Sequence, residues 1–166
     1  MDLTKKTVLF LCTGNSARSI LAEAILNNLG QGRFLAYSAG SKPTGTPHPL
    51  ALEQLESHGI DTGFASSKSW DIFAGPAAPN LDIIFTVCDS AAAEICPYWP
   101  GHPMTAHWGI PDPAATLGAL AQRQAAFVTA YASLTARIQA FLALDIDSVS
   151  PAALKSELIK IGQDTK

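Results

Sequence analysis

The sequence predicts an α/β protein of a single domain with a mostly parallel sheet, and three observations support this fold class. Short apolar runs typical of buried strands alternate with longer segments of helical periodicity. A chain of 166 residues suits one compact domain, residues 1–166, and is long enough to bury a core. No internal repeat, low-complexity tract or linker divides it.

Four segments have the composition of strands. Residues 7–11 form a continuous apolar, β-favouring run, which is typical of a strand covered on both faces of a parallel sheet. Residues 82–87, DIIFTV, give the next strongest signal of this kind. Residues 34–39 and 104–108 are weaker and shorter runs that complete a set of four expected strands.

The intervening segments predict helices. In residues 19–29 the apolar side chains recur at helical spacing, and Gly30 ends the pattern. Residues 48–58 predict a second helix, and a final helix begins near Pro151. Residues 117–142 predict a long amphipathic helix packed on the sheet, with an apolar face of Leu117, Leu120, Phe127, Val128, Tyr131, Leu134, Ile138 and Phe141.

Charge and hydropathy restrict the partners. A formal net charge of −3 argues against nucleic acid or an anionic membrane as the main partner, but it allows a small anionic substrate. No apolar run approaches the roughly 20 residues of a membrane-spanning helix. The stretch at residues 8–12 is too short for the core of a signal peptide. We therefore expect a cytoplasmic protein, with a monomer as the default state.

The three cysteines, Cys12, Cys88 and Cys96, cannot all pair at once. In a reducing compartment such a sparse, odd set argues against a structural disulfide framework. Catalysis, metal binding and plain burial remain. Zinc is disfavoured because the cysteines lack paired Cys-x2-Cys spacing and no histidine stands at ligand spacing from them.

Residues 10–19, FLCTGNSARS, are the most informative stretch, because they connect a predicted strand to a predicted helix. A loop in this position turns backbone N–H groups inward as a nest, with the helix N-terminus behind it, which suits a tetrahedral oxyanion. The oxyanion would lie against residues of this loop, namely Thr13, Gly14, Asn15, Ser16, Ala17 and Arg18.

Cys12 would be the nucleophile of this loop. The helix dipole and Arg18 both favour its thiolate, and Ser19 can donate a hydrogen bond to the same sulfur. Arg18 adds a planar fork that can bond two oxyanion oxygens, and Asn15 can brace the loop. The alternative is a buried cysteine followed by an ordinary helix cap, but the pattern Cys-x5-Arg-Ser between strand and helix favours the nucleophile.

The loop resembles that of the low-molecular-weight tyrosine phosphatase family, and more closely the arsenate reductases that share its fold. Other matching segments are YSAG at residues 37–40, GID at 59–61, TVCD at 86–89 and WGIPDP at 108–113, so the resemblance spans roughly residues 7–141. It implies a flavodoxin-like, three-layer α/β/α fold around a four-stranded parallel sheet. Ala17 departs from the pattern, because many of these proteins have another cysteine there.

Asp112 stands between two prolines, which restrict where its carboxylate points. When a thiolate attacks arsenate or phosphate, the departing oxygen needs a proton, and a nearby carboxylic acid can supply it. The resemblance implies that Asp112 is this general acid. On the local sequence alone, Pro-Asp-Pro is also a good exposed turn.

Cys88 and Cys96 favour reduction over phosphate hydrolysis. Cys12 and Cys88 each follow a predicted strand, so if those strands are neighbours both thiols lie at the carboxyl edge of the sheet. Cys12 could then attack arsenate, Cys88 could attack Cys12 to release arsenite, and Cys96 could attack Cys88. Thioredoxin would reduce the last disulfide. The segment at residues 89–95 looks helical but short, and the resemblance implies that it unwinds to bring Cys96 closer.

Three alternatives stay open. The first is a phosphatase for tyrosine phosphate or a small phosphoester, although Ala114 stands where phosphatase relatives usually carry an aromatic residue. The second is a non-enzymatic oxyanion sensor. The third is an arsenate reductase that uses glutathione and glutaredoxin, with Cys96 idle. For an arsenate reductase, phosphate and sulfate would be competing oxyanions, and no tightly bound cofactor is expected.

The resemblance also implies a weakly bound monovalent cation that stiffens the loop. Asn15, Glu23 and Ser38 match the residues that surround it, and Asp71 is a less certain fourth. The alternative is an internal hydrogen-bond network beneath the loop without any ion.

Overall fold

The structure is a computed structural model that describes residues 5–88 and 103–164. Its four strands form one parallel sheet in the order β2-β1-β3-β4, made up of β1 Lys6–Leu11, β2 Phe34–Ala39, β3 Ile83–Thr86 and β4 Met104–His107. β1 therefore lies between β2 and β3. The expected four parallel strands are confirmed, with bounds that differ by one residue at most.

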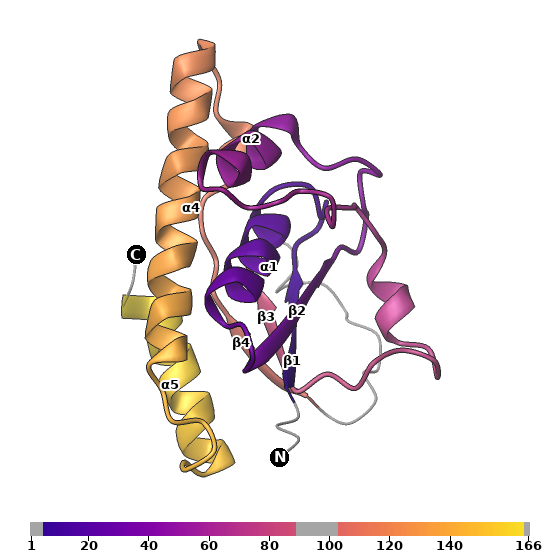
Figure 1. Ribbon diagram of the computed structural model, residues 1–166, viewed down its shortest axis with the longest axis vertical. Helices are drawn as coiled ribbons and strands as arrows, with labels where there is room; N and C mark the ends of the chain where they lie inside the picture. The colour runs from indigo at the N-terminus through magenta and orange to yellow at the C-terminus, as the bar shows by residue number, and fades with distance from the viewer. Residues whose placement is uncertain (1–4, 89–102, 165–166) are drawn as a thin grey trace.

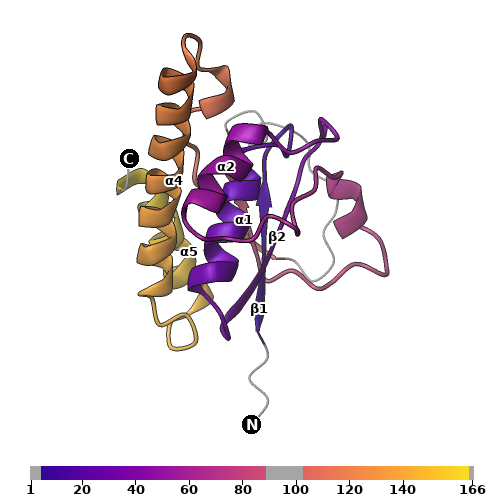
Figure 2. The same ribbon diagram turned by 45° about the horizontal axis from the view of Figure 1, so that its top comes forward.

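Four helices cover one face of this sheet (Figure 1). They are α1 Arg18–Leu29, α2 Pro49–Ser57, α4 Leu120–Leu142 and α5 Pro151–Asp164. The opposite face is covered, in the described part of the chain, by the 3-10 helix η1 Trp70–Phe73, which Figure 2 shows across the sheet from the helices. The sheet is thus enclosed on both faces, as the expected α/β fold requires.

The last four residues of β1, residues 8–11, are all apolar, and the structure shows why. Val8 and Phe10 face the helices, whereas Leu9 and Leu11 pack under η1 with Trp70. These four side chains are buried, whereas Lys6 and Thr7 at the start of β1 are only partly buried. Because both faces of a central parallel strand are enclosed, neither alternate set of side chains can be polar.

α5 packs closely against the end of β4. Trp108 is fully buried there, and its indole N–H donates to the carbonyl of Leu158 at 2.9 Å. A side chain at Gly162 would collide with the carbonyl of His107, so glycine is what permits this approach. Trp108 is therefore part of the core on the helical face of the sheet.

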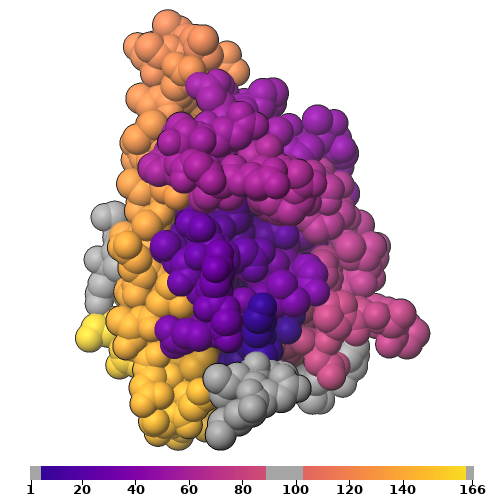
Figure 3. All heavy atoms as spheres, in the orientation of Figure 1, coloured from indigo at the N-terminus to yellow at the C-terminus, as the bar shows by residue number. Residues whose placement is uncertain are grey.

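The expected start of the long helix at Leu117 is wrong, because α4 begins at Leu120. Gly118 has a φ of 115°, which a helix cannot contain, and Leu117 is 89% exposed. Leu120 and Val128 are also exposed, because this end of α4 extends past α2 (Figure 3). The buried face is instead formed by Phe127, Ala130, Leu134, Arg137, Ile138 and Phe141.

None of the helices within residues 5–88 and 103–164 combines the length and apolar character needed to cross a membrane.

Candidate active site

The predicted oxyanion loop lies at the carboxyl end of the central strand. β1 ends at Leu11 and α1 begins at Arg18, so residues 12–17 connect the two. This is the edge of a parallel sheet at which ligands bind in open α/β folds. The strand–loop–helix arrangement expected from the sequence is confirmed.

The loop turns its carbonyl oxygens outward. Three of them accept N–H groups from the segment after β2: Thr13 from Lys42 at 2.9 Å, Gly14 from Thr44 at 3.0 Å and Ser16 from His48 at 2.9 Å. Carbonyls held outward leave the loop N–H groups for the concave side, which is the arrangement of an anion-binding nest. Asn15 has a φ of 44°, the only positive value at a non-glycine position in the described ranges.

Gly40 lies directly beneath this loop. A Cβ at this position would collide with the carbonyl oxygens of Cys12 and Thr13. β2 can therefore support the loop only because its sequence continues into a glycine. Sequence reasoning used Gly40 only as part of a motif and did not identify this packing role.

Arg18 and Asp112 meet at the mouth of the loop. Arg18 Nη1 donates to the carbonyl of Ile110 at 3.1 Å, and Nη2 lies 3.6 Å from Asp112 Oδ2. The Nε atom of Arg18 is buried and has no partner among the described residues, so it can donate to an oxyanion oxygen.

The other oxygen of Asp112, Oδ1, accepts the N–H of Ala114 at 2.9 Å and caps the 3-10 helix η2 Pro113–Ala115. This hydrogen bond fixes the orientation of the carboxyl group. The Asp112 side chain is 40% exposed. Asp112 is therefore held beside the arginine and open to solvent, as a proton donor to a departing oxygen requires.

Cys12 and Cys88 lie together, although 76 positions separate them in the sequence. Both are buried thiols, and their side chains are hydrogen-bonded to each other. The N–H of Thr13 points at Cys88 Sγ at 3.3 Å, and Thr13 Oγ1 is 3.6 Å from the same sulfur. The expected proximity of the two strand ends follows from the pairing of β1 with β3.

The environment of Cys12 acts on its pKa in both directions. The hydrogen bond with Cys88 and then burial raise the pKa of the Cys12 thiol well above its usual value. Arg18 and the N–H of Gly14 lower it. The lowering influence of Arg18 was expected, whereas the larger raising influence comes from the neighbouring thiol. This environment therefore favours the protonated thiol of Cys12.

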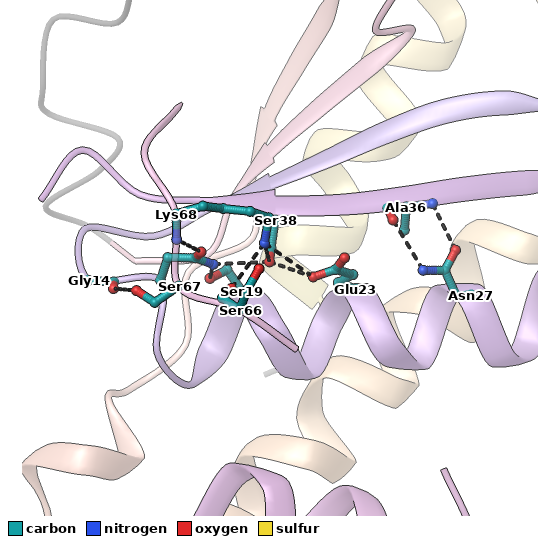
Figure 4. A network of polar contacts seen from close by, with 10 residues as sticks. Gly14, Ser19, Glu23, Asn27, Ala36, Ser38, Ser66, Ser67 and Lys68 are labelled. Atoms are coloured by element: carbon teal, nitrogen blue, oxygen red, sulfur yellow. Dashed lines mark hydrogen bonds and ion pairs between the residues drawn. The ribbon is translucent and has the colours of Figure 1, made fainter. Parts of the chain in front are cut away.

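A buried polar network supports the loop from below (Figure 4). Asn15 Nδ2 donates to Ser19 Oγ at 2.8 Å and to Ser38 Oγ at 3.0 Å, and Ser38 Oγ donates to Glu23 Oε1 at 2.5 Å. Lys68 joins them, because its Nζ donates to Ser38 Oγ at 3.2 Å. The structure thus brings together three of the residues considered for a cation and adds one that sequence reasoning missed.

Several expected site residues have other positions or lie outside the described residues. Asp71 lies exposed in η1. Ser19 is buried at the start of α1, and its hydrogen bond to the Cys12 sulfur stays a prediction. Cys96 and the expected helix at residues 89–95 fall outside the described residues.

His48, to which sequence reasoning gave no role, braces the site. Its backbone N–H holds the carbonyl of Ser16, and its Nδ1 accepts the N–H of Leu50 at the start of α2. The ring packs on Phe127 at 4.8 Å. Burial, and next the charge of Arg123, lower the pKa of His48, so the ring is neutral and able to accept this bond at neutral pH.

Comparison with known proteins agrees with this geometry. Residues 7–157 match the family model described as low molecular weight phosphotyrosine protein phosphatase. The chain belongs to this family. The match runs from β1 into α5 and includes all the site residues described above, so the low-molecular-weight phosphatase fold accounts for nearly the whole described chain.

Within the low-molecular-weight phosphatase family, the relatives include arsenate reductases. A Bacillus licheniformis protein named arsenate reductase is 35% identical over 139 residues, which cover 84% of this chain and 96% of that protein. A Shouchella clausii protein of the same name is 34% identical over the same coverage. A solved arsenate reductase in the phosphate binding state has a TM-score of 0.68 at 27% identity, covering 83% of this chain and 97% of the other.

Proposed function

We propose that this protein reduces arsenate to arsenite. The observation that carries the proposal is the contact between Cys12 and Cys88 at the oxyanion loop, because hydrolysis of a phosphoester has no use for a second thiol there. The arsenate reductases among its relatives support the same activity. Residues 1–166 would act as one cytoplasmic domain, with a monomer as its default state.

The first step would be attack of the Cys12 thiolate on arsenic. The loop N–H groups and Arg18 hold the oxyanion, and Asp112 gives its proton to the departing oxygen, which leaves as water. The product is a thiol–arsenate adduct in which arsenic is still at oxidation state five. The carbonyls of Thr13, Gly14 and Ser16 are already held outward, which supports binding of the anion on the concave side of the loop.

Cys88 would carry out the reduction. Its thiolate attacks Cys12 Sγ, the sulfur–arsenic bond breaks, and its electron pair stays with arsenic, which leaves as arsenite. The sulfur atoms are oxidised to a Cys12–Cys88 disulfide. Thr13 supports this step, because its N–H points at Cys88 Sγ and stabilises a negative charge on that sulfur.

The cycle would close through Cys96 and thioredoxin. Attack of the Cys96 thiolate on Cys88 frees Cys12 as a thiolate and forms a Cys88–Cys96 disulfide, which the dithiol of thioredoxin reduces. The alternative is a small thiol such as glutathione, with glutaredoxin, acting on the adduct while Cys96 stays idle. In the glutathione alternative, Cys12, Arg18 and Asp112 would keep the same roles.

A phosphatase activity is the second candidate function. Cys12, Arg18 and Asp112 are the groups that such a reaction requires, and all three meet at one loop. However, Ala114 follows the Asp112–Pro113 pair, so no aromatic side chain at this position can stack on a substrate ring. We therefore expect only slow hydrolysis of aryl phosphates.

The test is arsenate-dependent oxidation of NADPH, with thioredoxin and its reductase in one assay and glutathione, glutaredoxin and glutathione reductase in another. Turnover with thioredoxin that disappears in Cys12→Ser, Cys88→Ser and Cys96→Ser supports the full relay. Turnover only with glutathione retains arsenate reduction but removes Cys96 from it. Hydrolysis of an aryl phosphate without arsenate turnover in either assay would make this protein a phosphatase.

A further inference from the structure

We propose that the ammonium group of Lys68 takes the position of a loop-stiffening monovalent cation, so that the oxyanion loop of this protein needs no bound metal ion. Lys68 would be a positioning residue, because it contacts the network under the loop and not the substrate. This goes beyond the proposed function and does not depend on which oxyanion the loop binds.

The polar atoms that a cation would need are already engaged. The Ser38 hydroxyl has one proton and two lone pairs. It donates to Glu23 and accepts from Asn15 and Lys68, so all three capacities are used. Asn15 likewise directs its Oδ1 at the backbone N–H of Lys68, at 2.8 Å. The donor set therefore does not fit a metal ion as arranged.

Lys68 also supplies the charge that a cation would bring. Its Nζ lies 3.9 Å from Glu23 Oε1 and donates to the carbonyl of Ser66 at 3.1 Å, in addition to Ser38. The Glu23 side chain is only 8% exposed, and a carboxylate so deeply buried needs a positive partner. Figure 4 shows Ser38 from β2 and Glu23 from α1 converging with Lys68.

The segment around Lys68 is tied to the loop by more than its ammonium group. Its backbone carbonyl accepts the N–H of Gly40, and Ser67 Oγ donates to the carbonyl of Gly14 at 3.1 Å. Lys68 therefore holds Asn15, Gly40 and the buried carboxylate in one arrangement. The conformation of the loop at Asn15, with its positive φ, depends on these contacts.

The test compares wild type with Lys68→Met, which keeps the length of the side chain and removes its charge. Melting temperature and the rate of Cys12 alkylation by iodoacetamide are measured in about 0.15 M KCl and in tetramethylammonium chloride of equal ionic strength. Wild type should give the same values in both salts. The melting temperature of Lys68→Met should be about 2–4 °C higher in KCl than in tetramethylammonium chloride. Its rate of Cys12 alkylation in KCl should also return toward the wild-type rate.

Two further variants sharpen the result. Lys155→Met removes an exposed charge from α5 and should respond to neither salt. Lys68→Met combined with Glu23→Gln should lose the response to potassium, because no buried negative charge remains to attract the ion. Melting temperature and alkylation rate can both be measured without arsenate turnover. A failure of the proposed function would therefore leave this test intact.

The proposal is overturned if wild type gains stability from potassium as Lys68→Met does, because a metal ion would then bind beside the lysine. It is equally overturned if folded Lys68→Met ignores potassium. If Lys68→Met does not fold, Lys68→Gln replaces it, and the indifference of wild type to potassium remains a decisive measurement.

Discussion

At the scale of single residues, the reactivity of Cys12 is set by competing neighbours. Arg18 and the Gly14 N–H favour the thiolate, and Cys88 with burial favours the thiol. Cys88 has two effects on Cys12. Its hydrogen bond raises the pKa of Cys12, and in the proposed reaction its sulfur later attacks that of Cys12. The proximity of the two thiols therefore lowers the reactivity of Cys12 before the substrate binds.

This balance predicts how the pKa of Cys12 changes when Cys88 is replaced. In Cys88→Ala the raising hydrogen bond is lost while Arg18 and the Gly14 N–H remain, so the pKa of Cys12 falls. The thiolate fraction at a given pH rises accordingly. Alkylation of Cys12 followed by mass spectrometry across a range of pH should show its midpoint displaced toward lower pH. A midpoint that stays in place, with only a faster rate, would mean that Cys88 merely shields the sulfur.

Asp112 can be tested while its cap on η2 is kept. In Asp112→Asn the side-chain oxygen can still accept the N–H of Ala114 and cap η2, but the acidic proton is gone. We expect arsenate turnover to fall about a hundredfold or more. The melting temperature should change little, because the ion pair with Arg18 that is also lost is partly exposed and contributes little stability. Asp112→Ala loses the cap as well. Equal turnover in wild type and Asp112→Asn would exclude Asp112 as the general acid.

At the scale of elements, the strands and the first helix could be predicted because burial dictates their sequences. Residues 8–11 of β1 are enclosed on both faces and are all apolar, and α1 follows a loop whose residue types are specific. The start of α4 could not be predicted in the same way. Leu117, Leu120 and Val128 fit the apolar period, but periodicity does not show how far a helix extends past its neighbours.

The packing of α5 on β4 leads to a stability prediction. In Gly162→Ala the new methyl group meets the carbonyl of His107 and, at 2.9 Å, the ring of Trp108. We expect a loss of about 1–3 kcal/mol in the free energy of unfolding, measured with urea, although alanine is the better helix former.

Gly75→Ala is the matched control, because a Cβ at Gly75 meets nothing within 4 Å. It should change the free energy of unfolding by about 0.5 kcal/mol or less. Equal stability of the two variants would show that α5 does not approach β4 as closely as described.

At the scale of the whole molecule, the sheet order explains why distant motifs converge. Pairing of β1 with β3 brings Cys88 to the loop of Cys12, and pairing of β3 with β4 directs the chain toward Asp112 beside Arg18. The sequence allowed this convergence to be predicted, because residues that follow parallel strands meet at one edge.

Contacts made by unremarkable loop residues could not be predicted. Lys68 is 30 residues from Ser38, and nothing in its local sequence distinguishes it from a solvated lysine. His48 likewise follows the pattern of an ordinary helix cap, and its hold on Ser16 depends on the path of the chain after β2. Such residues are identified only when the tertiary contacts are known.

The most direct test of the central claim is to trap the first disulfide in Cys96→Ser. The reduced variant is mixed with arsenate, remaining thiols are alkylated in acid, and peptides are analysed by mass spectrometry without reduction. A Cys12–Cys88 disulfide, with one arsenite released for each disulfide formed, is the predicted result. Its absence from a variant that still reduces arsenate with an external thiol would contradict the relay.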